Sequence, residues 1–303
     1  MASKQELRFG ITTPFPRVPF RKMIEGWKFV EGLGFDSIWG GDHFVNWASP
    51  TDLWYEGWTA LAAMASHTSR IRIGMFACTA FHNPAFLARQ AQTVDHLSNG
   101  RLELALGCGF SHDISYEMTG MDNWKPPERV ARFREAVEIV DQLLRNKVTS
   151  YQGRYYRVKE AVMNPPPVQR PRPPFTILAS GETMLKYAAR YAETWNHPTS
   201  PGTLDERIEE TRRRSKLLDR YCSELNRDPH SLRRSALMLE PEARAQGGLM
   251  KIYESQEYFA EVIERYVEIG ITEFLLYYPF VDTQVPMLEK IARETIPKLR
   301  SMD

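Results

Sequence analysis

An acid, an imidazole and an indole occur together in the segment DHFVNW, at positions 42–47. The segment follows a strand-like stretch, residues 35–39, which ends in two glycines. Histidine transfers protons near neutral pH because its unperturbed pKa is about 6.5, and a nearby carboxylate can orient the ring or bind a ligand. In the structural alternative, Asp42 caps the next turn and His43 packs against Trp47. The spacing of these residues leaves both interpretations open.

Small residues end the next two strand-like stretches. One ends in Phe76-Ala77-Cys78, where small side chains let a flat ligand approach the backbone, although they also suit a narrow barrel mouth. The following stretch leads to Cys108, which lies between two glycines. A free cysteine is more often a small buried residue than a nucleophile. His112 lies a few residues further along and is a second candidate for proton transfer.

A candidate phosphate site follows the fifth stretch. Ser180, Gly181, Glu182 and Thr183 come directly before a helix predicted over residues 184–192. Backbone amides at the start of a helix attract anions, and the two hydroxyls and the glycine suit a phosphate. The charge of Glu182 would repel a phosphate unless the side chain points away from it.

All these segments would meet at one edge of an α/β barrel. Eight strand-like stretches alternate with amphipathic helices, which is the pattern that parallel strands with helical crossovers require. The stretches cover residues 7–12, 35–39, 71–77, 102–106, 175–179, 193–196, 235–239 and 273–278. In a (β/α)8 TIM barrel, the loops after the strands build the active site. We therefore expect a TIM barrel with the candidate residues at that edge.

The barrel pattern is interrupted before the fifth stretch. Residues 148–158 predict a small tyrosine-rich hairpin around Gly153, and residues 164–174 hold six prolines, which favour an extended path over the surface. Because the barrel pattern resumes at once, we interpret residues 148–174 as an insertion. The chain, residues 1–303, is then expected to form a single domain.

Composition excludes several classes of protein. Apolar residues make up 43% of the 303 and charged residues 25%, and the net charge of +1 favours no nucleic acid partner. No apolar run has membrane-spanning length and the first residues lack a signal-peptide core, so we expect a cytoplasmic protein with no membrane partner. The three cysteines lie outside any CxxC pattern, which suits a reducing compartment. The seven histidines form no HxH or HExxH pair, so no metal site is expected.

Several segments together resemble the bacterial luciferase-like monooxygenase superfamily, whose members are flavin- or deazaflavin-dependent α/β barrels. The segments are GFDSIWGGDHF, HNPAFLARQAQTVDHLSNGRLELALGCG, YQGRYYRV, PPPVQRPRPPFTILASGE and LKYAARYAETWN. The resemblance covers nearly the whole chain. As a set, the segments are specific for the superfamily and much less specific for the substrate.

Asp42-His43-Phe44 followed by Trp47 is similar to the deazaflavin-dependent branch, which uses coenzyme F-420. The resemblance implies that Asp42 contacts the deazaflavin, while His43 and Trp47 face the substrate near the carbon that carries the hydride. His112 joins them as a catalytic candidate. The implied cofactor-binding residues are Asp42, Phe76, Ala77, Cys78, Cys108, Ser180, Gly181, Glu182 and Thr183.

Two details of the resemblance concern the third and fourth stretches. The superfamily often has a non-proline cis peptide that supports the tricyclic ring, and here it would be Phe76–Ala77 or Ala77–Cys78. The family's aromatic-x-His-Glu segment corresponds to residues 110–113, where Asp113 replaces the glutamate. Some dehydrogenases of the branch use a glutamate proton donor after this strand, and its absence argues against their sugar-phosphate chemistry.

We therefore expect an enzyme, an oxidoreductase that moves hydride between coenzyme F-420 and a small, apolar organic substrate. The apolar substrate is inferred from aromatic residues near the active edge. These are Phe44, Trp47, Trp54, Tyr55, Phe81, Phe110 and Trp124. One alternative is a monooxygenase that uses reduced FMN from a separate flavin reductase, and another is a non-catalytic flavin-binding barrel. Barrels of this superfamily are often homodimers, and the expected interface is the apolar surface around Trp58 and Phe86.

Overall fold

The computed structural model describes residues 6–12, 18–46, 49–199, 201–240, 243 and 248–301. Trp47, one of the expected catalytic residues, lies outside the described residues. The barrel strands are β1 (Arg8–Thr12), β2 (Ser37–Gly41), β3 (Arg72–Cys78), β4 (Leu102–Gly107), β7 (Phe175–Leu178), β8 (Thr194–Pro198), β9 (Arg233–Met238) and β10 (Glu273–Tyr277). The helices are α1 (Phe20–Gly32), α2 (Gly57–His67), α3 (Pro84–Leu97), α4 (Ser115–Thr119), α5 (Pro126–Arg145), α6 (Glu182–Tyr191), α7 (Leu204–Glu224), α9 (Gln256–Val267), α10 (Val285–Lys290) and α11 (Ile296–Ser301).

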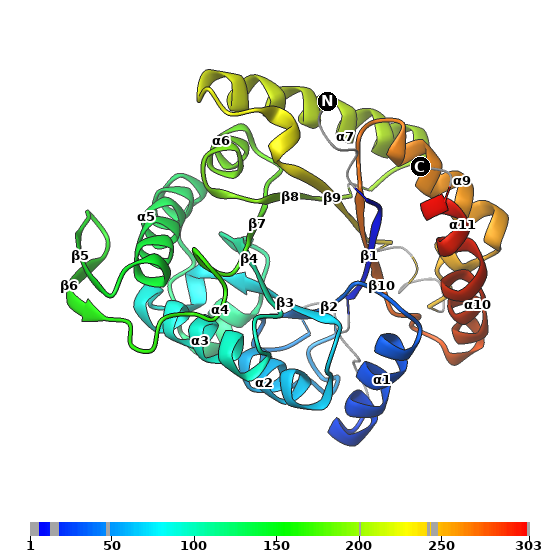
Figure 1. The fold of residues 1–303 in the computed structure, drawn as a ribbon, viewed down its shortest axis with the longest axis horizontal. Coiled ribbons are helices and arrows are strands. Elements are labelled where there is room, and N and C mark those ends of the chain that lie inside the picture. Colours follow the sequence, from blue (N-terminus) through cyan, green and yellow to red (C-terminus); the bar gives the residue numbers. More distant parts are fainter. Residues whose placement is uncertain are drawn as a thin grey trace. The chain divides into compact units, whose positions relative to one another are not determined.

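The described strands form a closed barrel in the order β1-β10-β9-β8-β7-β4-β3-β2 (Figure 1). The pairs β1–β10, β10–β9, β9–β8, β7–β4 and β4–β3 are parallel. The predicted (β/α)8 TIM barrel is confirmed. Sequence patterns found the strands because buried parallel strands are apolar on both faces. The boundaries differ by up to two residues: the second stretch, predicted over residues 35–39, is β2, which includes Gly40 and Gly41.

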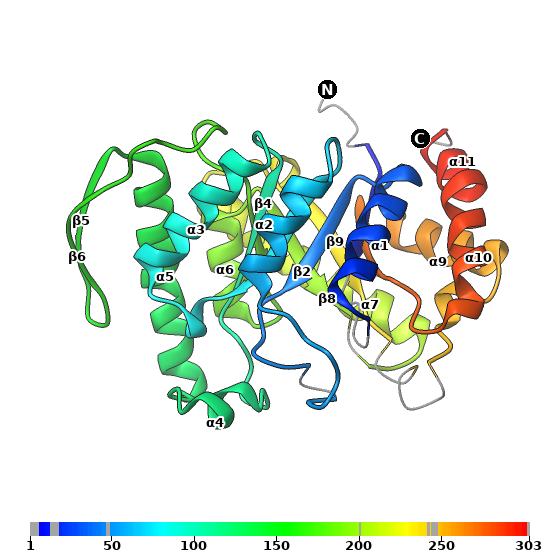
Figure 2. The same ribbon diagram turned by 90° about the horizontal axis from the view of Figure 1, so that it is seen from below.

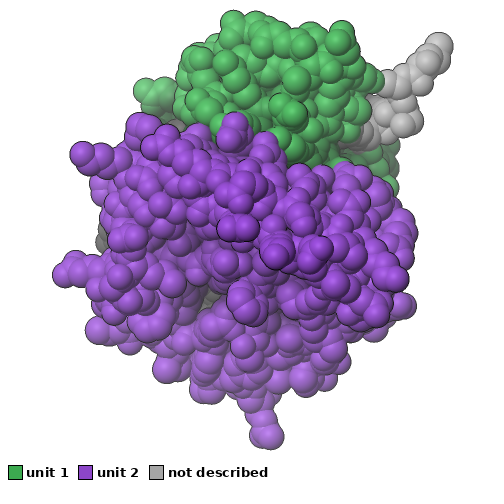
Figure 3. All heavy atoms as spheres, turned by 90° about the vertical axis from the view of Figure 1, so that its left-hand side faces the viewer, with its two compact units in different colours: residues 1–13, 29–38, 178–303 green, residues 14–28, 39–177 purple. Residues whose placement is uncertain are grey.

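The chain divides into two compact units, which Figure 3 colours separately. Unit 1 comprises residues 1–13, 29–38 and 178–303, and unit 2 comprises residues 14–28 and 39–177. That residues 1–303 form a single domain stays a prediction.

In unit 2, the insertion forms an antiparallel hairpin of β5 (Val148–Gln152) and β6 (Arg157–Val162). Figures 1 and 2 show the hairpin beside α5. The buried carboxylate of Glu135, on α5, accepts hydrogen bonds from the backbone N–H groups of Arg154, Tyr155 and Tyr156 at 2.9, 2.9 and 3.1 Å. The hairpin extends further than the predicted residues 148–158, because the strands pair out to Val148 and Val162.

In unit 2, the dipeptide Asn83-Pro84 predicts a capped helix start, and the start of α3 confirms it. The side chain of Asn83 accepts a hydrogen bond from the N–H of Ala85, and Pro84 occupies the first helical position. This arrangement satisfies an amide that the helix leaves unpaired and fixes where the loop after β3 ends.

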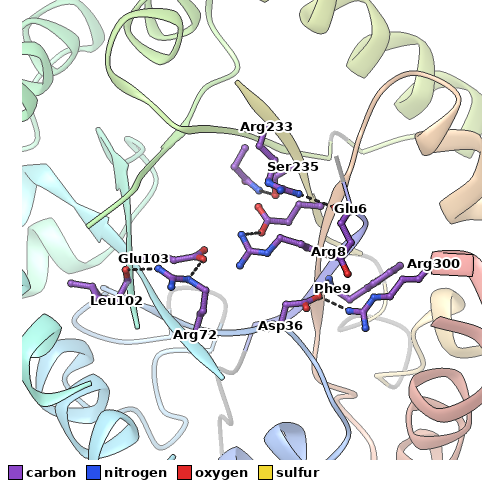
Figure 4. A network of polar contacts seen from close by, with 12 residues as sticks. Glu6, Arg8, Phe9, Asp36, Arg72, Leu102, Glu103, Arg233, Ser235 and Arg300 are labelled. Carbon is purple, nitrogen blue, oxygen red and sulfur yellow. Dashed lines mark hydrogen bonds and ion pairs between the residues drawn. The ribbon is translucent and has the colours of Figure 1, made fainter. Parts of the chain in front are cut away.

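In unit 1, the two faces of the strands differ in character. Arg8, which is labelled in Figure 4, pairs with Glu273 at 3.1 Å on one face of β1 and β10. The other face carries Phe9 and Phe274, whose ring centroids are 5.5 Å apart, and Phe259 of α9 lies 6.3 Å from Phe9. The aromatic face therefore packs against a helix, while the opposite face holds charges in pairs.

The consecutive arginines Arg233 and Arg234 predict a solvated helix face, and this prediction is wrong. Both belong to β9, and Arg234 is buried. Its guanidinium donates to the Ser215 hydroxyl at 2.9 Å and to the Asp219 carboxylate, both on α7. An arginine can be buried in a strand when partners on the covering helix satisfy its charge and donors.

The expected dimer surface is also corrected in part. Trp58 is only 4% exposed and offers no surface, because it packs inside unit 2, whereas Phe86 is 73% exposed. The homodimer stays a prediction. Among the described residues, no helix combines the length and apolar character needed to span a membrane.

His197, on β8, is a fully buried histidine whose two ring nitrogens have no hydrogen-bond partner among the described residues. Its ring stacks on Trp195 at 5.6 Å. Burial, and then the charge of Arg214, lower the pKa of His197 to about 4, and Glu210 only partly opposes this. Between these two pKa values, the imidazole of His197 is therefore neutral in the folded protein and protonated in the unfolded chain.

His197 should make the folded protein acid-sensitive. Between about pH 6.5 and pH 4, the unfolded state binds a proton at His197 that the folded state does not, so stability falls as the pH is lowered. From pH 7.5 to pH 5 this contribution is about 2 kcal/mol, and it should be absent in His197→Leu. Urea unfolding of both proteins at both pH values measures it. Equal losses of stability in the two proteins would contradict the assignment.

Candidate active site

Asp42 and His43 directly follow β2, and each pairs with a residue from a different loop of unit 2. The His43 Nδ1 atom lies 2.6 Å from the Asp113 Oδ2 atom. The Asp42 Oδ2 atom lies 2.6 Å from the His82 Nε2 atom. Two consecutive residues thus form two Asp–His pairs. Asp42 supplies the acid of one pair, with His82, and His43 supplies the imidazole of the other, with Asp113.

Asp42 is buried, and one of its oxygens accepts two hydrogen bonds. The Oδ2 atom accepts from the backbone N–H of Cys78 at 3.1 Å in addition to the bond with His82. Its other oxygen, Oδ1, makes no hydrogen bond within the described part of the chain. The carboxylate therefore joins the ends of β2 and β3 through one oxygen and keeps the second available as an acceptor.

His43 is held so that one ring nitrogen remains available. An ionised carboxylate can only accept hydrogen bonds, so the bond to Asp113 places the proton on Nδ1 and leaves the lone pair of Nε2 free. The indole of Trp54 donates to the His43 carbonyl at 2.6 Å, and the rings of Trp54 and Phe110 lie 6.3 and 5.7 Å from the imidazole. The free nitrogen thus lies among aromatic side chains.

Asp113 is the acid that orients His43, whereas the sequence had indicated its neighbour, Asp42, for this role. Burial alone would raise the pKa of Asp113, but hydrogen bonds from His43 and from Ser115 outweigh it and hold the pKa below its usual range. The Ser115 N–H donates to the second oxygen of Asp113 at 2.9 Å, and the Ser115 hydroxyl accepts from the N–H of Phe44 at 3.2 Å. The start of α4 therefore fixes the loop that carries His43.

His112 is exposed, and among the described residues it makes no hydrogen bond with His43. It lines a surface hollow of about 430 Å³ together with residues of the α4 segment, Asp113 among them. Its assignment as a catalytic residue stays a prediction.

The expected cis peptide at the end of β3 is not present. The cis bonds among the described residues are Asn164–Pro165 and Arg170–Pro171, both before proline, so the bonds from Phe76 to Cys78 are trans. β3 pairs with β4 in unbroken register as far as Cys78, and a non-proline cis bond would cost about 3–4 kcal/mol within that ladder. Support of a ring by this strand would have to come from its backbone and small side chains.

The two cysteines near this edge are not set up as nucleophiles. Burial, and then the charge of Asp42, raise the pKa of Cys78 to about 12. Burial also raises the pKa of Cys108. Because the thiolate is the reactive form, both side chains act here as small packing groups.

The start of α6, in unit 1, matches the expected phosphate site in form. Gly181 is the N-cap residue and has no side-chain cap, and Gly181, Glu182 and Thr183 are exposed. The carboxylate of Glu182 accepts from the hydroxyl of Tyr221, on α7, at 3.2 Å. This contact directs the charge of Glu182 toward α7, and the backbone amides of the first turn remain open to an anion. Phosphate binding by these residues stays a prediction.

The aromatic residues expected around the substrate fall into two groups. Tyr55 packs on Phe20 at 5.2 Å, Phe81 on Tyr116 at 5.0 Å, and the guanidinium of Arg132 covers the ring of Trp124 at 4.1 Å. These three therefore have structural partners.

Phe44 and Phe110 are different, because they are 60% and 36% exposed and lie next to the His43–Asp113 pair. Together with Trp54, they form the apolar surroundings of His43. Among the residues that the structure describes, no group of three or more metal-binding side chains occurs.

Gly109, after β4, has a backbone that only glycine adopts readily. Its φ is +75°, and a Cβ at this position would lie 2.6 Å from the Tyr116 hydroxyl and 2.8 Å from the Cys78 sulfur. Gly107 is a matched control, because a Cβ there would have no neighbour within 4 Å and its φ is not positive.

Gly109→Ala should therefore destabilise the protein by about 2 kcal/mol or more, through the left-handed backbone and the overlap with two buried groups. Gly107→Ala should stay within about 1 kcal/mol of the wild type. Urea unfolding of the three proteins provides the comparison. Equal effects of the two substitutions would show that the turn at Gly109 is not constrained.

A model of the luciferase-like monooxygenase family matches residues 7–221 of the chain. The F-420-dependent glucose-6-phosphate dehydrogenase of Segniliparus rotundus is 26% identical over 326 residues, which cover 93% of this chain and 95% of the relative. The enzyme of the same name from Amycolatopsis mediterranei is 33% identical over 175 residues, 56% of this chain, so the match spans about half of that relative, 51%. The 5,10-methylenetetrahydromethanopterin reductase of Archaeoglobus fulgidus is 29% identical over 188 residues, covering 62% of this chain and 52% of the relative.

Solved structures agree on the fold. An F-420-dependent secondary alcohol dehydrogenase in complex with an F-420–acetone adduct has a TM-score of 0.80 at 20% identity, covering 96% of this chain and 100% of its own. A monooxygenase from Streptomyces bottropensis has a TM-score of 0.75 at 22% identity, covering 96% and 99%. At such identities the likeness establishes the fold alone, and enzymes with different chemistry share it.

Proposed function

The chain belongs to the luciferase-like monooxygenase family, and from this membership we propose that it is an oxidoreductase transferring hydride between coenzyme F-420 and a small, largely apolar organic substrate. The observation that carries the proposal is the pair of Asp–His contacts at the end of β2. At adjacent positions, they present an Asp42 oxygen that no described residue uses and the second ring nitrogen of His43, Nε2. The names of the relatives support the choice of cofactor, because they include F-420-dependent enzymes.

The residues present suit a deazaflavin. Asp42 offers an acceptor that is not used by the protein, next to a β3 end that consists of small, buried residues, Ala77 and Cys78. At Gly107, the last residue of β4, a Cβ would have no neighbour within 4 Å, so this strand end leaves open space. These residues of unit 2 would hold the ring. The first turn of α6, in unit 1, is proposed separately as a phosphate-binding site.

Bound coenzyme F-420 accepts or donates hydride in two-electron steps. His43 would supply the accompanying proton chemistry through its Nε2 atom, taking a proton from a substrate hydroxyl or returning one to a carbonyl. Asp113 would stabilise the imidazolium that forms when His43 holds two protons, as a buried hydrogen-bonded carboxylate does for a catalytic histidine. Trp54 and Phe110 would limit the access of water to the reacting atoms.

The apolar substrate is supported by the surroundings of His43. The exposed side chains next to it, Phe44 and Phe110, are aromatic, and the ring of Phe110 lies 5.7 Å from the imidazole of His43. The acid after β4, Asp113, is already engaged with His43 and Ser115. Asp113 therefore has no unengaged oxygen with which to bind a strongly polar sugar phosphate.

The cofactor class is tested by titrating the purified protein with coenzyme F-420 and, separately, with FMN, while following fluorescence. We expect saturable binding of coenzyme F-420 and binding of FMN at least about tenfold weaker, a difference of about 1.4 kcal/mol. Preferential binding of FMN would instead support the reduced-flavin monooxygenase, and no binding of either would contradict the proposal.

Substitutions at positions 42 and 43 should affect different steps. His43→Ala removes a positioned general acid–base and should lower turnover about 10²–10⁴-fold, with the affinity for coenzyme F-420 nearly unchanged. Asp42→Ala removes a buried hydrogen-bond partner and should weaken cofactor binding by about 1–3 kcal/mol. Fluorescence titration and turnover at saturating cofactor separate the two effects. Wild-type turnover by His43→Ala would make the histidine structural.

A further inference from the structure

His82 is the one member of the two Asp–His pairs without a role in the proposed function. The run Phe81-His82-Asn83-Pro84 suits a helix start, and nothing in it indicates a partner for His82. We propose that His82 is a positioning residue for the cofactor, acting through Asp42. This inference rests on the proposed function, since it concerns the same ligand.

Two donors from the turn after β3 converge on a single oxygen of Asp42. The N–H of Cys78, the last residue of β3, donates to Oδ2 at 3.1 Å, and His82 Nε2 lies 2.6 Å from the same atom. Turning the carboxylate over would break both contacts. Because both bonds use Oδ2, Oδ1 is held in one direction and remains free for a ligand.

The ring of His82 is itself fixed from behind. It meets the indole of Trp58 edge-on, with the centroids 6.4 Å apart and the planes at 84°. Trp58 is buried in the first turn of α2. Its backbone N–H donates to the carboxylate of Glu56, which caps that helix, at 3.0 Å. His82 therefore connects the rigid start of α2 to the carboxylate, and its proton on Nε2 is directed at Oδ2.

The contact between His82 and Asp42 would favour ligand binding as well as stabilise the fold. A carboxylate with one donor can rotate, and fixing a hydrogen-bonding group in its bound orientation before the ligand arrives reduces the cost of binding. If His82 served only to hold its turn, its loss would lower stability and leave the affinity for the cofactor unchanged. If it acts through Asp42, its loss should weaken binding only while the carboxylate is present.

The test is a double-mutant cycle on cofactor affinity, measured by fluorescence titration with coenzyme F-420. The proteins are the wild type, His82→Ala, Asp42→Ala and the double variant. His82→Ala should raise Kd about tenfold, the loss expected for a hydrogen bond to a charged group. In the Asp42→Ala background, the same change should raise Kd less than about twofold, because nothing is left to position.

Two further variants separate positioning from folding. His82→Gln keeps an N–H donor at similar reach and should restore binding to within about threefold of the wild type. His67→Ala is the matched control, because His67 is exposed on α2 and bonds only to a carbonyl of its own helix. It should leave Kd unchanged. Thermal unfolding of each variant confirms that it is folded at the temperature of the titration.

The outcomes distinguish the inference from the proposed function. Wild-type affinity in folded His82→Ala, or an equal loss in both backgrounds, would overturn the role of His82 and leave the cofactor assignment intact. If the wild type binds FMN in place of coenzyme F-420, the proposed function fails, and the same cycle with FMN decides the role of His82. If the wild type binds neither, both are overturned.

Discussion

The candidate site depends on two short hydrogen bonds that give consecutive residues opposite partners. Asp42 and Asp113 are both buried, and a buried carboxylate costs several kcal/mol unless hydrogen bonds satisfy it. Each acid has taken an imidazole and a backbone N–H as donors. Both buried acids need these donors. The contacts that supply them leave one oxygen of Asp42 and one ring nitrogen of His43 free.

The barrel makes these pairings possible, because strands that are neighbours in it end at the same edge. β2 supplies the consecutive residues, the turn after β3 supplies His82, and the segment after β4 supplies Asp113. α4 then secures the arrangement through Ser115, which bonds both to Asp113 and to the loop that carries His43. The chemistry of the site thus depends on three loops, while the sheet determines only where those loops begin.

Much of this fold could be predicted from the sequence, and the reasons are physical. Buried parallel strands are continuous apolar runs, and the start of α3 follows from an asparagine and a proline that act locally. Asp42 and His43 were found because they directly follow such a run. The partners could not be found in this way: Asp113 is 70 residues from His43, and His82 is 40 residues from Asp42. Nothing local to either residue indicates the contact.

The errors have two origins. Arg234 was assigned to a solvated face because its partners, Ser215 and Asp219, are on another element. The cis bond was expected from the family resemblance. In this chain β3 pairs with β4 in regular register up to Cys78, and the peptide bonds of β3 are trans. Family membership is informative about the fold and the class of cofactor, but one fold serves many substrates, so the substrate depends on the side chains of the site.

The protonation pattern of the two imidazoles tests the central claim most directly. Long-range ¹H–¹⁵N correlation spectra, recorded at a pH where both rings are neutral and assigned with the His43 and His82 variants, report which nitrogen carries the proton. The account predicts a proton on Nδ1 of His43, with Nε2 bare, and a proton on Nε2 of His82. A proton on Nε2 of His43, or a bare Nε2 on His82, would contradict it.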